Sequence, residues 1–87
     1  MVCLVTYDLN KEVVRPKIVK AIDDNWNWAR LSESSYAIES DDPAGAYATL
    51  SKLLDSNDQL YVITLKLPYT GQGSEEVNQW LDHRLTW

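Results

Sequence analysis

The chain has 87 residues, of which 45% are hydrophobic and 24% are charged, and its formal net charge at pH 7 is −5. This length accommodates one small domain with a single core, and the hydrophobic fraction excludes an intrinsically disordered chain. The acidity argues against generic nucleic-acid binding, which depends on basic contacts to phosphates. No apolar run approaches the ~20 residues that span a bilayer, so no membrane partner is expected.

The N-terminal segment alternates loosely and is rich in Val, Leu and Thr, which predicts a strand over residues 2–8. Asn10 is suited to cap the helix that follows, because an Asn side chain accepts from the free N–H groups of a first turn. That helix is expected over residues 12–24, with Pro16 in its first turn. Its apolar face recurs every four residues: Val14, Ile18 and Ile22.

The central part of the chain predicts two short strands, 28–31 and 35–40, joined by a polar turn. A second helix is expected within residues 41–58, where Asp42 is a plausible cap and Pro43 a first-turn residue. The apolar face of this helix contains Ala46, Leu50, Leu53 and Leu54.

The segment QLYVITLKL, residues 59–67, is the strongest predicted strand. A loop over 68–73 leads into a short helix over 74–85, with Ser74 as its cap and acidic residues near its positive N-terminal end. The apolar stripe of this last helix contains Val77, Trp80 and Leu81.

The predicted order is strand, helix, strand, strand, helix, strand, followed by a C-terminal helix. This order is that of a single α+β domain, residues 1–87, with a ferredoxin-like fold. The expected sheet has four antiparallel strands in the spatial order 4-1-3-2, with two helices on one face.

The first and last strands carry apolar side chains on both faces, while two helices can cover only one face of the sheet. An exposed apolar patch on the other face usually marks an interface. We therefore expect a homodimer, with the two sheets facing each other or with the C-terminal segment laid across a partner, whose interface includes Leu4, Leu60, Val62 and Trp80. The four tryptophans are expected in the core and at dimer contacts, although nucleic-acid bases could also stack on them.

The acid that ends the first strand, Asp8, has two interpretations: a turn or cap residue, or a ligand for a metal or phosphate. The cationic side chains of Arg15 and Lys17 are interpreted either as a solvated helix face or, with Arg30, as phosphate contacts. The lone His83 is a poor zinc signal and is expected to interact with the end of its helix. The only cysteine, Cys3, lies in an apolar run and is expected to be a buried thiol.

Four segments together resemble a known group of proteins: VTYDLN, WARLSESSYAIES, LLDSNDQLYVITL and GQGSEEVNQWLDHRL. In order and spacing they resemble the SinR-like proteins, which are similar to the small CRISPR adaptation endonucleases and the VapD-type toxins. In the nuclease relatives the acid that ends the first strand helps to bind a divalent metal at a dimer interface. The resemblance therefore implies a metal-binding and catalytic role for Asp8, with Mg²⁺ or Mn²⁺ as cofactor and an amide oxygen from Asn10.

Two functions follow from these expectations. The first is a dimeric, metal-dependent ribonuclease or nuclease-derived protein that uses Asp8, with phosphate contacts from Arg15, Lys17 and Arg30. The second is a non-catalytic, acidic interaction protein that binds a basic surface on a protein partner. The nuclease relatives often carry an arginine-rich helix after the acid, and this chain has only Arg15, Lys17 and Lys20 there. A cytoplasmic location is expected, because the N-terminus lacks the pattern of a signal peptide.

Overall fold

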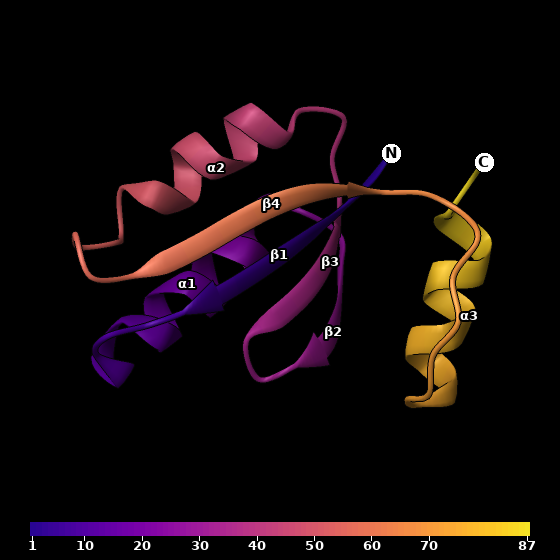
Figure 1. The fold of residues 1–87 in the computed structure, drawn as a ribbon, viewed down its shortest axis with the longest axis horizontal. Helices are drawn as coiled ribbons and strands as arrows, with labels where there is room; N and C mark the ends of the chain where they lie inside the picture. The colour runs from indigo at the N-terminus through magenta and orange to yellow at the C-terminus, as the bar shows by residue number, and fades with distance from the viewer.

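The computed structural model describes residues 1–87 and contains a four-stranded antiparallel sheet with three α-helices (Figure 1). It confirms the α+β class. The elements in chain order are β1 Val2–Asp8, the 3₁₀ turn η1 Glu12–Val14, α1 Arg15–Asn25, β2 Trp28–Ser32, β3 Ser35–Glu39, α2 Pro43–Ser51, β4 Gln59–Leu65 and α3 Glu75–Arg84.

The strands lie in the order β2-β3-β1-β4, and every neighbouring pair is antiparallel. The register aligns rows of residues across the sheet. Leu4 lies opposite Ala37 on β3 and opposite Ile63 on β4. Directly opposed residues project to the same face of a sheet, so each row assigns its members to one face.

The first face of the sheet is covered by α1 and α2, which enclose the main core. Helix α1 contributes Ile18 and Ile22 and α2 contributes Ala46 and Leu50, all at most 3% exposed. The sheet contributes alternate residues of three strands: Cys3, Val5, Tyr7, Tyr36, Ile38 and Leu60. The predicted apolar faces are thus confirmed for Ile18, Ile22, Ala46 and Leu50, and Cys3 is buried as expected. Val14, Leu53 and Leu54 pack against the same core but lie outside the two α-helices.

The second face of the sheet is partly covered by α3, which stands apart from α1 and α2 (Figure 1). Here Leu81 and Leu85 pack against Val2 of β1 and Ala37 of β3 in a smaller cluster of four buried residues. The sequence predicted this helix and its apolar stripe. Its position on the sheet became visible only in the tertiary structure.

Helix ends follow the predicted caps in two of three cases. The Asp42 carboxylate accepts from the Gly45 N–H at 2.9 Å, and the Ser74 hydroxyl accepts from the Val77 N–H at 3.2 Å. The prediction that Asn10 caps the first helix is wrong, because the chain enters α1 through the turn η1. The Asn10 backbone N–H instead donates to the Asp58 carboxylate at 2.7 Å and so joins two loops.

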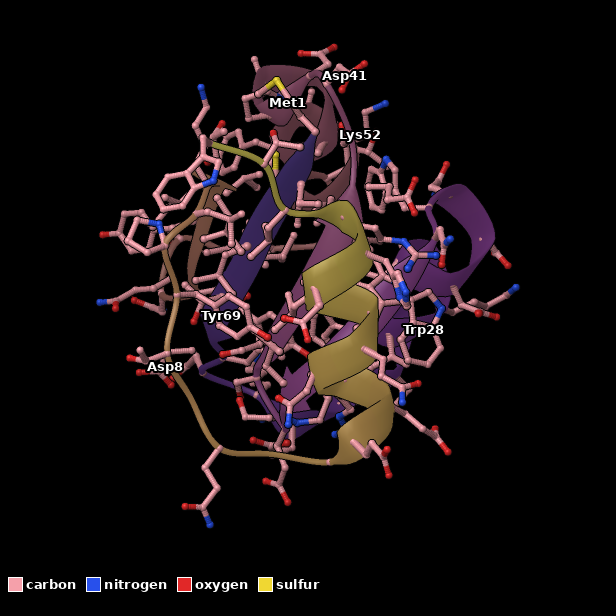
Figure 2. The ribbon with its side chains drawn as sticks, turned by 90° about the vertical axis from the view of Figure 1, so that its right-hand side faces the viewer. Met1, Asp8, Trp28, Asp41, Lys52 and Tyr69 are labelled. Atoms are coloured by element: carbon pink, nitrogen blue, oxygen red, sulfur yellow. The ribbon has the colours of Figure 1, made fainter.

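The chain ends are held in different ways. The N-terminal ammonium of Met1 pairs with Asp41 at 2.6 Å (Figure 2), and this contact raises the pKa of the ammonium. Near the C-terminus, the Leu67 N–H donates to the Thr86 carbonyl at 2.8 Å and fixes the segment after α3 beside the end of β4. None of the three α-helices is long and apolar enough to cross a membrane.

Candidate functional site

The second face of the sheet has an uncovered region beyond the reach of α3. We call it the open strip and define it by Leu4, Thr6, Tyr61 and Ile63. These residues form two adjacent rows, because Leu4 pairs with Ile63 and Thr6 pairs with Tyr61. Tyr61 is 62% exposed and Ile63 is 50% exposed, whereas Leu4 and Thr6 are half-buried. The open strip therefore presents an aromatic and an aliphatic side chain to solvent from one strand.

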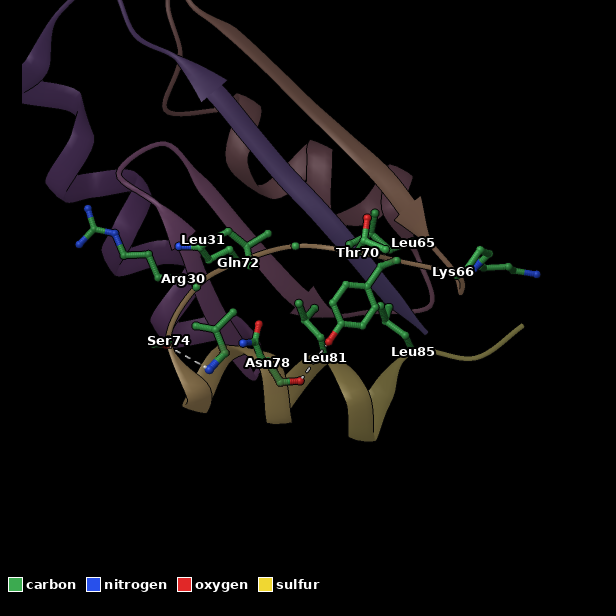
Figure 3. A pocket seen from close by; sticks show the side chains of 15 residues that line it. Arg30, Leu31, Leu65, Lys66, Thr70, Gln72, Ser74, Asn78, Leu81 and Leu85 are labelled. Carbon is green, nitrogen blue, oxygen red and sulfur yellow. Dashed lines mark hydrogen bonds between the residues drawn. The ribbon is translucent and has the colours of Figure 1, made fainter.

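A hollow of about 520 Å³ adjoins the open strip, between α3 and the loop that follows β4 (Figure 3). Leu31, Leu65, Leu81 and Leu85 line it, while the charged ends of Arg30 and Lys66 point away from it. Tyr69 fastens the loop to α3, because its hydroxyl donates to the Asp82 carboxylate at 2.6 Å. That contact raises the pKa of Tyr69. The hollow is thus apolar on its inner side and bounded by a tethered loop.

Asp8 is exposed at the end of β1, opposite Gln59 at the start of β4. In Figure 2 it lies on the side of the molecule opposite Trp28. A shallow hollow of about 260 Å³ is lined by Asp8, Gln59, Tyr61 and their neighbours Thr6 and Tyr7. By the alternation of β1, Asp8 projects to the same face as Leu4 and Thr6. The carboxylate therefore stands at one end of the open strip.

The residues around Asp8 do not make a metal site within one chain. No group of three or more His, Cys, Asp or Glu side chains in residues 1–87 could hold a metal ion. Asn10, the second expected ligand, is exposed, and its backbone is tied to Asp58. Mg²⁺ requires near-octahedral oxygen coordination and usually takes one or two protein carboxylates together with waters and substrate phosphates. With Asp8 as the single carboxylate here, the other ligands would come from water, a second copy or a bound ligand.

Arg15 is occupied by contacts within the chain. Its guanidinium donates to both oxygens of Glu12, at 2.7 and 3.1 Å, and to the Ser34 hydroxyl at 3.0 Å. It also donates to the Glu33 carbonyl and lies 5.6 Å from the centre of the Tyr7 ring. The hydrogen bonds with Glu12 raise the pKa of Arg15 and lower the pKa of Glu12. This arginine joins the start of α1 to the β2–β3 turn.

The two other predicted phosphate contacts lie apart from the open strip. Lys17 is an exposed residue of α1, on the covered side of the sheet. Arg30 is exposed on β2, where its Nε donates to the Ser32 carbonyl at 3.2 Å and its guanidinium lies 5.7 Å from the Tyr36 ring. Tyr36 belongs to the main core, so Arg30 projects to the first face of the sheet, the one covered by α1 and α2. The structure does not bring these cations to Asp8.

The expected dimer residues divide between the two faces of the sheet. Leu4 belongs to the open strip. Leu60 is 7% exposed and Val62 is partly buried against the main core, because α1 and α2 cover the even-numbered side of β4. Their place in a dimer interface stays a prediction. Trp80 is half-buried within the chain. Its indole N–H donates to the Asn27 side chain at 3.3 Å, and the Arg84 guanidinium lies 4.5 Å from the centre of its ring.

Tyr61 and Ile63 are the exposed residues that the sequence analysis did not select. The alternation of β4 places Tyr61 and Ile63 on the opposite face from Leu60 and Val62. Because both faces are apolar, the pattern alone did not indicate which face is buried. A usable signal was present in β1, where Cys3 and Val5 form the more uniformly apolar set. The β4 residues opposite them in the register lie on the covered face.

Comparison with known proteins adds no assignment: no family model matches this chain, and no curated protein matches it.

Proposed function

We propose that this chain is a small, non-catalytic interaction protein that works as a homodimer. Its fold is ferredoxin-like, and it belongs with the SinR-like proteins that its sequence resembles. The order of strands and helices supports the fold, since a split β-α-β-β-α-β arrangement with β1 and β3 central is typical of it.

The observation that carries the proposal is the exposure of Tyr61 and Ile63 on one strand. Isolated exposed hydrophobic residues are normal, but a tyrosine and an isoleucine on neighbouring rows of one sheet face form a continuous patch. Aromatic residues are enriched where protein interfaces bury most of their area. The open strip is therefore the surface we assign to association.

Three further observations support a binding role over catalysis. The single chain has no group of acids or histidines able to hold a metal. Arg15 already donates to Glu12 and to Ser34 of the β2–β3 turn, so a phosphate would have to compete with these contacts. The net charge of −5 disfavours nucleic acid and favours a basic surface on a protein partner.

Sedimentation velocity tests the association directly. We expect a species of twice the 10.0 kDa chain mass at micromolar concentration, dissociating on dilution. Replacing Ile63 by Lys should shift the equilibrium to the monomer, whereas Val13→Lys, at an exposed residue outside the sheet, should not. A parent chain that stays monomeric throughout the micromolar range would refute the proposal.

A second candidate function, metal-dependent RNA cleavage, is favoured by one observation. Asp8 is exposed and stands at the end of the open strip, so two copies joined face to face would bring two such carboxylates to their interface. Two carboxylates with water are a suitable environment for Mg²⁺ or Mn²⁺. The resemblance to nuclease relatives assigns the role to the same residue.

Incubation of the chain with RNA, with and without Mg²⁺ or Mn²⁺, separates the two candidates. The proposed interaction protein should leave RNA intact under all conditions. Metal-dependent cleavage that is lost in Asp8→Asn and kept in Glu76→Gln, an exposed acid of α3, would establish the nuclease instead. Cleavage that survives Asp8→Asn would point to a contaminant.

A further inference from the structure

The outer edge of β4 is open. β4 is the last strand in the sheet order and pairs only with β1. Figure 1 shows it beside β1 with no further strand on its outer side. An edge strand presents a row of N–H and C=O groups that can template another strand.

The register identifies which groups face this open edge. The Tyr7 N–H donates to the Ser34 carbonyl at 2.9 Å, so the backbone groups of Tyr7 point toward β3. Tyr7 is opposite Leu60, and this pair is therefore not hydrogen-bonded across the β1–β4 ladder. Because antiparallel ladders alternate, the outward groups belong to Leu60, Val62 and Thr64. They provide three donors and three acceptors.

The β4 edge lacks the charges, prolines and bulges that often protect an edge strand. Gln59–Leu65 contains no charged residue and no proline, and its register with β1 is continuous. The other edge strand, β2, is different: it carries Arg30 and its register shifts between Arg30 and Ser32. Both edge strands contact a helix, α3 at β2 and α2 at β4. Charge and bulges are typical edge protection. Charge and a register shift thus protect the β2 edge of the sheet, and the β4 edge has neither.

We propose that two copies of this chain pair antiparallel through β4, about a two-fold axis at Val62, to form one continuous eight-stranded sheet. The inference rests on the proposed self-association and specifies its geometry. In this register Val62 lies opposite Val62 of the second copy, and Leu60 lies opposite Thr64. All of these are hydrogen-bonded pairs, so each outward N–H and C=O group of the strand finds a partner.

The same register accounts for the exposed side chains. Tyr61 lies opposite Ile63 of the second copy in a non-hydrogen-bonded pair, the type in which side chains approach most closely. Aromatic and β-branched residues are favourable cross-strand partners. The two exposed hydrophobic side chains of the strand therefore contact each other across the joint, on the second face of the joined sheet.

Charge also favours a second copy as the occupant. The paired strands are uncharged, so the contact itself adds no repulsion between two chains of net charge −5. Just beyond the strand ends, the register brings exposed Lys66 of each copy opposite Asp58 of the other, a half-buried residue whose carboxylate also accepts from the Asn10 and Asp55 N–H groups. Opposite charges in such positions favour this alignment over a shifted one.

Edge pairing has a consequence for Asp8. The two β1 strands would be separated by both β4 strands, which places them ~14 Å apart at the usual strand spacing. The two Asp8 carboxylates, at opposite ends of the joined sheet, could not share a metal ion. The proposed geometry and a shared metal site therefore exclude each other.

Amide hydrogen exchange measured by NMR, at concentrations below and above the dimerisation midpoint, tests the geometry. The amides of Tyr61 and Ile63 donate within the sheet and should be protected at both concentrations. The amides of Leu60, Val62 and Thr64 should exchange rapidly in the monomer and become protected in the dimer. Because one strand and few flanking side chains make a contact smaller than a standard interface, we expect a micromolar dissociation constant.

Two variants complete the test. Thr64→Pro removes an outward donor at an exposed edge position where proline is tolerated, and it should raise the dissociation constant at least about tenfold, since each copy loses one hydrogen bond. Thr70→Pro, in the exposed loop after β4, is the control and should leave the constant unchanged. Circular dichroism checks that both variants fold.

The outcomes separate this inference from the proposed function. Alternating protection that appears with concentration, together with weakened association of Thr64→Pro, supports edge pairing. A dimer in which Leu60, Val62 and Thr64 remain unprotected overturns edge pairing and leaves the homodimer standing with another geometry. A chain that remains monomeric overturns both.

Discussion

Single residues in this protein are assigned to structure or to binding by their burial and their partners. Arg15 and Lys17 are neighbours in the sequence and both cationic, yet Arg15 is fixed by Glu12 and Ser34 whereas Lys17 is exposed. The sequence predicted the burial of Cys3, since an apolar run surrounds it. It could not predict the contacts of Arg15, because Ser34 is 19 residues away along the chain.

The buried Cys3 and Tyr7 predict how stability depends on pH. Burial raises the pKa of Cys3 above its ordinary 9.0 and the pKa of Tyr7 above its ordinary 10.0. A group whose pKa is higher in the folded state contributes its full stability below the unfolded pKa and loses it as pH rises through the folded pKa. We therefore expect the free energy of unfolding to fall as the pH rises above 9.0.

Urea unfolding across this pH range measures the effect. Cys3→Ala and Tyr7→Phe should each flatten the decline, because each removes one buried ionisable group. Tyr47→Phe, at an exposed tyrosine, should follow the parent profile. A free energy of unfolding that is constant or rises in alkaline solution would contradict the assignment.

Individual elements are set by local signals that the structure largely confirms. α2 begins at Pro43 after the predicted cap Asp42, and α3 follows its cap Ser74. The exception is the first helix, where Asn10 is not the cap and a 3₁₀ turn comes first. The Asn10 backbone N–H donates instead to the carboxylate of Asp58, which lies in a distant part of the chain.

At the start of α2, replacing Gly45 by alanine should destabilise the fold, although the same change inside a helix usually stabilises it. A Cβ on Gly45 would lie 2.2 Å from the Asp42 carboxylate oxygen that faces it, so alanine would displace the cap. Gly to Ala inside a helix normally stabilises by about 1 kcal/mol, but loss of a cap costs about 1 kcal/mol and the collision adds to that cost. We expect Gly45→Ala to destabilise the parent chain.

A double-mutant cycle with urea unfolding tests this coupling. In the background of Asp42→Ala, where neither cap nor collision exists, Gly45→Ala should stabilise by about 1 kcal/mol. Equal effects of Gly45→Ala in both backgrounds would show that the cap and the glycine are independent.

The whole molecule is built from two clusters of unequal size around one sheet. Ten buried residues hold α1 and α2 on the first face, and four hold α3 on the second. The hollow beside α3 further limits the area that this helix buries. Elements with few buried contacts open at lower free energy than the core does. α3 is therefore the part of the fold that we expect to detach first.

Native-state hydrogen exchange tests this order of opening. Amides of α3 should exchange at lower free energy than those of β1 and β3. Leu81→Ala should accelerate exchange in α3 well beyond its effect on β1, because Leu81 packs in the smaller cluster. The surface variant Val13→Ala should change neither. Uniform acceleration across helix and sheet would show that they unfold as one unit.

The sequence alone determined the α+β class, the succession of elements, two helix caps and the alternation of each strand, because these depend on residues within a few positions of one another. The tertiary structure decided which side of β4 the helices cover, where α3 lies, that Arg15 is committed internally and that the β4 edge is open. These features depend on contacts between distant segments, and both sides of β4 are apolar. Only packing against α1 and α2 could therefore bury Leu60 and leave Tyr61 and Ile63 exposed.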